Sequence, residues 1–236
     1  MRTRVVGTAL ALLLAACSPT LPMAITVPSR GAAPLANRAT VVTAGVGGGG
    51  EGLVFGSGGV GGTVEVEHQF HDGALGAQVA GGGKDPSDGH ESYWPNWLVA
   101  ARLTGQMNLG VPWAALRLGL GGGMMDRGVR YGTGDATLLV SHRFRWIPSY
   151  RSTWLEPFVG VTAASTKMLA TSLRLDTAGD RLTPGEWAVF AGPCFGLRGG
   201  ADRVWGSLAM SWDIPVAGPG PDDVGLVTLA RIGFAL

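Results

Sequence analysis

The sequence is poor in charged residues. Only 15% of its 236 residues are Asp, Glu, Lys or Arg, whereas 46% are hydrophobic, and the formal net charge is +1. Low charge combined with this hydrophobic content argues against a disordered chain and against an ordinary soluble surface. A chain so close to neutrality also gives no reason to expect nucleic acid as a partner.

Cysteine and histidine are too scarce to build a cross-linked or metal-bound fold. There are two cysteines, Cys17 and Cys194, and four histidines. If Cys17 is modified, as argued below, Cys194 has no partner, and a disulfide framework is excluded. One free thiol and scattered histidines offer no metal-ligand spacing. We therefore expect neither a metal nor another cofactor.

Long apolar runs are missing beyond the N-terminus, so no second helical span is expected. The N-terminus itself has the pattern of a secretion signal, with Arg2 and Arg4 before the apolar core 5–14. It ends in Leu-Ala-Ala-Cys at 14–17, which resembles the lipobox of bacterial lipoproteins. The resemblance implies cleavage before Cys17 and acylation of its thiol, palmitate being one expected chain. An ordinary signal peptide with a chance cysteine is the alternative. Ser18, in place of aspartate, favours sorting to the outer membrane.

Prolines and small residues follow the signal. Pro19, Pro22, Pro28 and Pro34 lie among small and polar residues, a composition typical of a tether. We therefore divide the chain into a signal peptide at 1–16, a lipidated N-terminus and tether at 17–37, and one folded domain at 38–236.

The clearest folding pattern runs from Trp97 to Gly123. Two segments of about ten residues flank the turn sequence 108–112, and in each segment apolar residues alternate with small, polar or arginine residues. Alternation with period two is typical of strands. About ten residues is also the length that a tilted strand needs to cross a bilayer. An apolar face opposite a mixed polar face suits lipid outside and a polar interior.

The same alternation recurs along the folded domain. We expect ten strands, near 38–48, 63–71, 74–83, 97–107, 113–123, 136–146, from 154, 186–198, 203–213 and 224–236. Short connections near 72, 110, 149 and 200 alternate with longer loops, among them 84–95, 126–135, 167–184 and 214–223. The pattern resembles small bacterial outer-membrane β-barrel proteins of the OmpA-like and porin-like kind. The resemblance implies an all-β, up-and-down antiparallel transmembrane barrel of about ten strands, with eight as the alternative.

Two features bear on this fold prediction. A soluble, lipid-anchored β-sandwich is the rival fold. Pro193 falls within a predicted strand, where it removes a ladder hydrogen bond, so we expect a bulge or local break there.

Aromatic residues on the outer face or near the strand ends are expected to form an interfacial girdle. They are Phe70, Tyr93, Trp94, Trp97, Trp146, Tyr150, Trp154, Trp187 and Trp212.

Charged residues of the expected strands fall mainly on the inward face. They are Glu65, Glu67, Arg102, Arg117, Arg143, Arg145, Glu156, Glu186, Arg198, Arg203, Asp213 and Arg231. One interpretation is a charged channel or binding lumen. The other is a network of ion pairs that fills a narrow barrel, because small barrels leave room for little but side chains. We favour the filled barrel and count two more arginines than acids in it.

No catalytic pattern stands out. Ser141 and His142 are adjacent on a strand and point to opposite faces, so they cannot form a nucleophile–base pair. His90 with Asp85, Asp88 and Glu91 is the one loop cluster that could bind a cation or a base-requiring substrate, and we favour the alternative of a solvated loop. The sequence thus predicts a lipid-anchored outer-membrane barrel with a structural or surface-interaction role in the envelope of a Gram-negative-type bacterium. A small-solute pore and a barrel enzyme acting on lipids or peptides are the alternatives. Expected partners are outer-membrane lipid, the barrel assembly and lipoprotein sorting machineries, and a surface ligand bound by the long loops.

Overall fold

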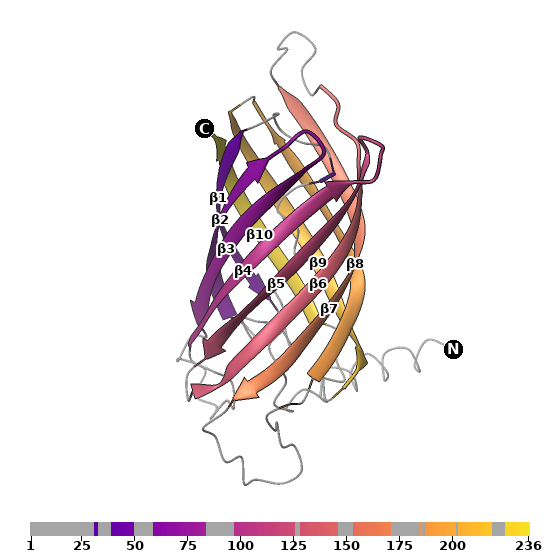
Figure 1. Ribbon diagram of the computed structural model, residues 1–236. Helices are drawn as coiled ribbons and strands as arrows, with labels where there is room; N and C mark the ends of the chain where they lie inside the picture. Colours follow the sequence, from indigo (N-terminus) through magenta and orange to yellow (C-terminus); the bar gives the residue numbers. More distant parts are fainter. Residues whose placement is uncertain are drawn as a thin grey trace, which may run out of the picture.

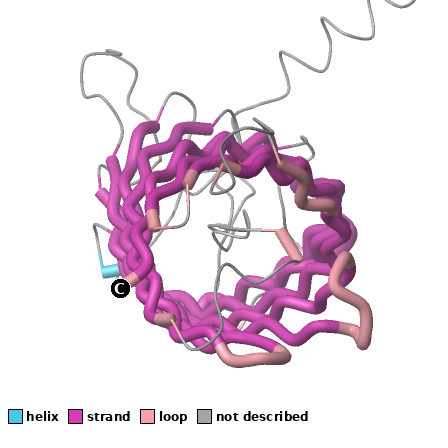
Figure 2. Tube along the Cα trace, turned by 90° about the horizontal axis from the view of Figure 1, so that it is seen from above, coloured by secondary structure: helices cyan, strands magenta, loops and turns pink. Residues whose placement is uncertain are grey.

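The computed structural model is a closed barrel of ten antiparallel strands. It describes residues 31–32, 39–49, 59–83, 97–125, 128–145, 153–170, 185, 187–201, 203–218 and 225–236. Each strand pairs with its neighbours in chain order, and β10 closes the barrel against β1 (Figures 1 and 2). This confirms the predicted fold class and decides for ten strands over eight. The predicted signal peptide lies outside the described residues.

The strands run from 10 to 17 residues in length. Their bounds are β1 Thr40–Gly49, β2 Gly59–Gln69, β3 Gly73–Gly83, β4 Trp97–Asn108, β5 Ala114–Met125, β6 Arg130–Ser141, β7 Trp154–Ala170, β8 Trp187–Gly200, β9 Val204–Ala217 and β10 Gly225–Ala235. Within the described residues, no helix is long and apolar enough to cross a membrane.

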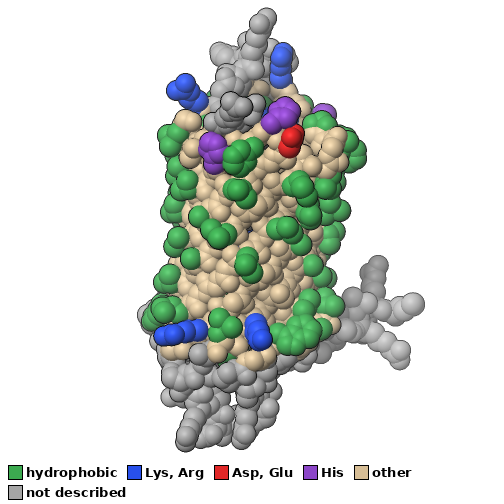
Figure 3. Space-filling model, in the orientation of Figure 1, with side chains coloured by type: hydrophobic (Ala, Val, Ile, Leu, Met, Phe, Trp, Pro, Cys, Tyr) green, Lys and Arg blue, Asp and Glu red, His purple; other side chains and the backbone are tan. Residues whose placement is uncertain are grey.

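The wall of the barrel separates apolar from polar side chains as the alternation predicts. On β4, Val99 and Leu103 are exposed, whereas Arg102 and Thr104 are buried. The exposed apolar side chains continue around the wall, for example Leu120 on β5 and Val161 on β7. Figure 3 shows, on the visible face, Lys and Arg near both ends, acidic and His side chains near the upper end, and hydrophobic side chains along the wall between the ends.

The two ends of the barrel differ in their connections. At one end, which we call the turn end, residues 70–72 join β2 to β3 and residues 109–113 join β4 to β5. It also holds the C-terminus, where the Leu236 amide donates to the Thr40 carbonyl at 2.8 Å, and it lies at the top of Figure 1. The opposite end, which we call the loop end, includes the connections from β1 to β2 and from β3 to β4.

Several strand boundaries differ from the sequence-based prediction. Residues 130–135, which were predicted to belong to a loop, are part of β6, which begins at Arg130 and ends at Ser141, before the predicted end at 146. Likewise, β7 continues to Ala170 and β9 continues to Ala217, into stretches predicted to be loops. Glycine-rich and polar segments are typical of loops, but in this barrel such segments also form strands that pair with their neighbours.

The expected irregularity near Pro193 is present on one side of β8. The β8–β9 pairing passes from Ala191↔Ile214 to Cys194↔Ser211 with no paired partner for Gly192 or Pro193, and the register also shifts between Val189 and Phe190. On the other side of β8, Pro193 still pairs with Val161. Because proline has no amide hydrogen to donate, the break falls on one ladder only.

Candidate functional site: the ion-paired lumen

Most charged residues predicted to point inward are buried in the lumen. The buried ones are Glu65, Glu67, Arg102, Arg117, Glu156, Arg198, Asp213 and Arg231, and Arg143 is partly buried. Apart from Asp213, which lies toward the loop end of β9, they fall into two groups, one centred on Arg117 and the other on Glu156. Both lie toward the turn end or the middle of their strands.

The first group centres on Arg117 of β5. Its guanidinium forms an ion pair with Glu65 of β2, and its Nη1 lies 3.9 Å from Oε2 of Glu67. Glu65 also accepts a hydrogen bond from the Thr104 hydroxyl at 3.3 Å. Since β2 and β5 are separated by two strands, this contact reaches across the lumen, and it fixes the distance between parts of the wall that do not pair.

A second ion pair in this group depends on a glycine. Arg102 of β4 binds Asp135 of β6, two strands away. The intervening strand, β5, presents Gly119, where a Cβ atom would collide with the Arg102 guanidinium and with the Asp135 carboxylate. A side chain at this position would therefore separate the two ions, and the glycine is needed for the close approach of side chains rather than for its backbone freedom.

The second group surrounds Glu156 at the turn end. Its Oε2 accepts hydrogen bonds from Arg143 Nε and Nη2, at 3.0 and 2.8 Å, and from Arg198 Nη2 at 2.7 Å. Its Oε1 accepts one from the Ser141 hydroxyl at 2.8 Å. Two donors of Arg143 and one of Arg198 therefore converge on a single carboxylate oxygen, and these charge-assisted hydrogen bonds are stronger than neutral ones. One carboxylate thus joins β7 to β8 and to the end of β6.

Two tryptophans enclose the Arg198 guanidinium. Its Cζ lies 5.2 Å from the ring centre of Trp154 and 5.3 Å from that of Trp205, within the range of a cation–π contact. Arg143 lies 4.7 Å above the same Trp154 ring. Trp154 therefore faces inward, and its predicted place in the outer aromatic girdle is wrong. The girdle prediction overlooked that an aromatic residue can also cover an arginine.

Two residues that were predicted to face the lumen lie outside it, and one buried acid was not predicted. Arg145 and Arg203 are exposed, because Arg145 follows the end of β6 and Arg203 lies in the turn before β9. Glu186 lies outside the described residues. Asp135 is buried in the lumen and was missed, because the sequence around it was interpreted as a loop.

The charges of the described lumen therefore balance. Five acids and five arginines remain, in place of the predicted excess of two arginines. The acids are Glu65, Glu67, Asp135, Glu156 and Asp213, and the arginines are Arg102, Arg117, Arg143, Arg198 and Arg231. We refer to these ten residues as the lumen network.

Toward the loop end, the lumen is mostly apolar. Leu98, Tyr131, Met168, Phe190 and others form one buried cluster that draws residues from eight strands. The four named residues lie where β4, β6 and β8 begin and where β7 ends, whereas Leu139 and Phe158 extend the cluster toward the turn end. The inward side chains thus separate along the barrel axis, with ion pairs toward the turn end and apolar packing toward the loop end.

Two described residues of the predicted tether are not exposed to solvent. Gly31 and Ala32 are buried against inward-facing residues of the wall. The main chain of this pair is held by the wall, and the rest of the predicted tether at 17–37 lies outside the described residues. Proline-rich composition indicates the absence of regular structure, but it does not show whether the chain is held by something else.

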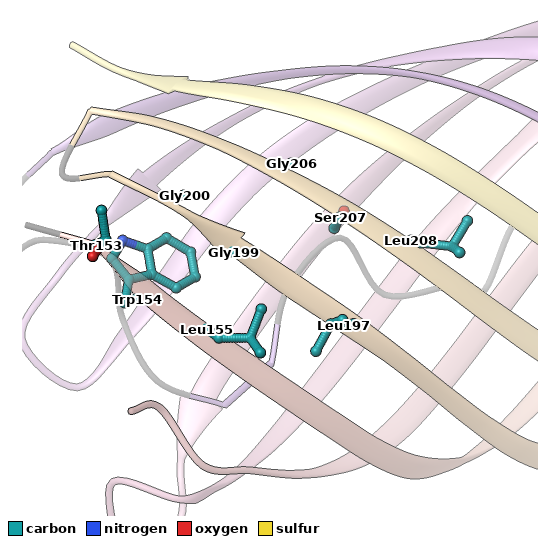
Figure 4. A pocket seen from close by; sticks show the side chains of 9 residues that line it. All are labelled: Thr153, Trp154, Leu155, Leu197, Gly199, Gly200, Gly206, Ser207 and Leu208. Atoms are coloured by element: carbon teal, nitrogen blue, oxygen red, sulfur yellow. The ribbon is translucent and has the colours of Figure 1, made fainter. Parts of the chain in front are cut away.

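An apolar pocket of about 470 Å³ lies in the wall near the turn end. It is formed by β7, β8 and β9, where Gly199 pairs with Gly206 and leaves space between Leu155, Leu197 and Leu208 (Figure 4). Its lining suits an apolar group and offers no pair of groups for acid–base chemistry.

The described histidines occupy the outside and the rim. His68 contacts the Thr40 hydroxyl at 3.1 Å, and the His142 ring stacks on Phe144. His71 lies 3.7 Å from Asp72, but the two side chains are 83% and 87% exposed in a hairpin turn. His90 and its acidic neighbours lie outside the described residues. Among the described residues, no group of three His, Cys, Asp or Glu could hold a metal ion.

The fold and the lumen together define the chain as a closed ten-stranded antiparallel β-barrel with an ion-paired interior. Comparison of the sequence with known protein families and with characterised proteins gives no match. The functional argument therefore rests on the barrel itself.

Proposed function

We propose that the chain is a lipid-anchored outer-membrane β-barrel whose lumen is sealed and whose role in the cell envelope is structural or surface-interacting. Support for the membrane assignment comes from the exposed apolar side chains around the wall, including Leu103, Leu120 and Val161. Strands of 10 to 17 residues are long enough to cross a bilayer when tilted. The lipobox-like sequence before Cys17 supports the anchor.

The lumen network is the observation that carries the sealed-lumen proposal. Arg117 connects β5 to β2, Arg102 connects β4 to β6, and Glu156 holds Arg198 and Arg143. Ion pairs that span the interior place side chains where a water path would have to run. Balanced charges also remove the net field that an ion-selective pore uses.

The alternatives fit the geometry less well. A pore needs a continuous path past Arg102 and Arg117, which are 8% and 2% exposed. A barrel enzyme needs a positioned base, and the His71–Asp72 contact is a solvent-exposed pair of neighbours in a turn. The proposed partners are outer-membrane lipid and the machineries that sort lipoproteins and assemble barrels. The loops are the proposed site for a surface ligand.

Fractionation of cells tests the membrane assignment. The wild-type chain is expected in the outer-membrane fraction, with lipid label on Cys17. A Cys17→Ala variant should lose the label but stay embedded, because the wall rather than the lipid holds it in the bilayer. A variant that is folded and freely soluble in the periplasm would contradict the spanning barrel, whereas label retained after the substitution would contradict the anchor site alone.

A further inference from the structure

The lumen holds a short piece of main chain that belongs to none of the ten strands. Gly31 and Ala32 are both buried, Ala32 at 1% exposure. They lie against Gln106 of β4, Ser141 of β6 and Glu156 of β7, all of which face inward. These three residues lie near the turn end of their strands.

Side chains of the wall satisfy the polar groups of this main chain. The Ala32 amide donates to the Ser141 hydroxyl oxygen at 2.8 Å. The Gln106 side-chain amide donates to the carbonyls of Gly31 and Ala32, at 3.3 and 3.2 Å. Buried main-chain groups carry a large free-energy cost unless they are hydrogen-bonded. Ser141 and Gln106, on different strands, therefore provide the hydrogen-bond partners that a buried peptide backbone needs.

The lumen network orients one of these two residues. The Ser141 hydroxyl donates to Glu156 Oε1 at 2.8 Å, so its hydrogen is committed and its oxygen is left to accept the Ala32 amide. Glu156 is itself fixed by two arginines. Glu156 thus orients the Ser141 hydroxyl so that its oxygen accepts the hydrogen bond from the Ala32 amide.

The contact also selects the residue type at position 31. A Cβ atom there would lie 2.7 Å from Ser141 Cβ and would collide with Glu156 Oε1. Only glycine fits without moving the wall. The site therefore recognises a Gly-Ala backbone by its main-chain groups and by the absence of a side chain at position 31.

From these contacts we infer that the turn end of the lumen contains a main-chain recognition site, and that its ligand is the chain's own segment at Gly31–Ala32. The segment docks as an internal ligand that links β4 to β6 and β7. Cys17 precedes Gly31 by 14 residues, which span at most about 50 Å. A lipid on Cys17 is therefore compatible with docking, and the site does not depend on the lipid.

Disulfide trapping tests the docking directly. In the mature, membrane-inserted chain with Cys194→Ala, Gly31→Cys combined with Ser141→Cys should cross-link on mild oxidation. Disulfides need about 3.8 Å between Cβ atoms, so the segment has to shift by roughly 1 Å from the present 2.7 Å. The matched control pairs Gly31→Cys with Thr133→Cys, which faces inward on β6 eight residues earlier, roughly 26 Å along the strand.

The first pair should cross-link in most molecules and the control pair in few. Equal cross-linking of both pairs would overturn the site, and if neither pair cross-links, the labelling experiment below decides. Because a cysteine at position 31 perturbs the contact that it probes, labelling of Ala32→Cys provides a second measurement. A membrane-impermeant maleimide should modify it at least 100-fold more slowly in the folded chain than it modifies Ala201→Cys, in the exposed turn after β8. Comparable rates would show an accessible segment and refute the proposal.

Discussion

Replacement of Glu156 by Gln should destabilise the barrel more than any other conservative change in the lumen network. The substitution keeps the shape of the side chain but removes the charge that Arg198 and Arg143 bind at 2.7 and 2.8 Å. Arg198 is fully buried, whereas the Arg143 side chain is 24% exposed. The cost therefore arises mainly from Arg198, which would remain a buried cation without its carboxylate.

Removing one partner of a buried ion pair costs about 3–5 kcal/mol. The contacts of Arg198 with Trp154 and Trp205 are the same in both proteins, and glutamine keeps a carbonyl oxygen that accepts from the guanidinium, so we take the lower end of this range. We expect a net loss near 3 kcal/mol in the free energy of unfolding, which is roughly a 150-fold change in the unfolding equilibrium. Urea titration in lipid vesicles, followed by tryptophan fluorescence, measures it.

The control for this prediction is Glu67→Gln. Glu67 lies 3.9 Å from Arg117, which keeps its closer partner Glu65. A loss of about 1 kcal/mol is expected there. If Glu156→Gln changes the stability by less than 1 kcal/mol, or by no more than Glu67→Gln, the Glu156 group does not hold the wall as described.

Three further experiments test other parts of the barrel. Leu120→Arg, in the middle of β5 and 71% exposed, should cost about 2–4 kcal/mol in lipid, and Val140→Arg, next to the turn end of β6, about 0–1 kcal/mol; equal costs in an unfolding titration would argue against a bilayer around the wall. Gly119→Val should destabilise by about 1–3 kcal/mol through overpacking of the neighbouring ion pair, whereas Gly134→Val, where a new Cβ meets only ordinary contacts, should be nearly neutral in the same titration. Buried Cys194 should resist a thiol reagent until the chain unfolds, and rapid labelling of the folded protein would contradict its place in the wall.

The barrel wall could be predicted from sequence because its pattern is local. Alternation places Val99 and Leu103 outside and Arg102 and Thr104 inside without knowledge of any other strand. The same reasoning predicted the break near Pro193, since the missing amide hydrogen is a property of that residue alone.

The contacts inside the barrel could not be predicted in the same way. Arg102 reaches Asp135 across a strand, and the reason is the space above Gly119, which no spacing in the sequence reveals. Asp135 itself followed a glycine-rich run and was assigned to a loop, because polar residues in strands are recognisable only when their partners are known. The burial of Gly31 depends on side chains of three strands that are remote from it in sequence.

Single-channel recording in planar lipid bilayers tests the sealed lumen most directly. The purified, full mature protein should insert without producing a stable ohmic current at moderate voltage, because ion pairs and buried apolar side chains fill the interior. A reproducible open channel from the wild-type protein would contradict the sealed barrel and favour the small-solute pore.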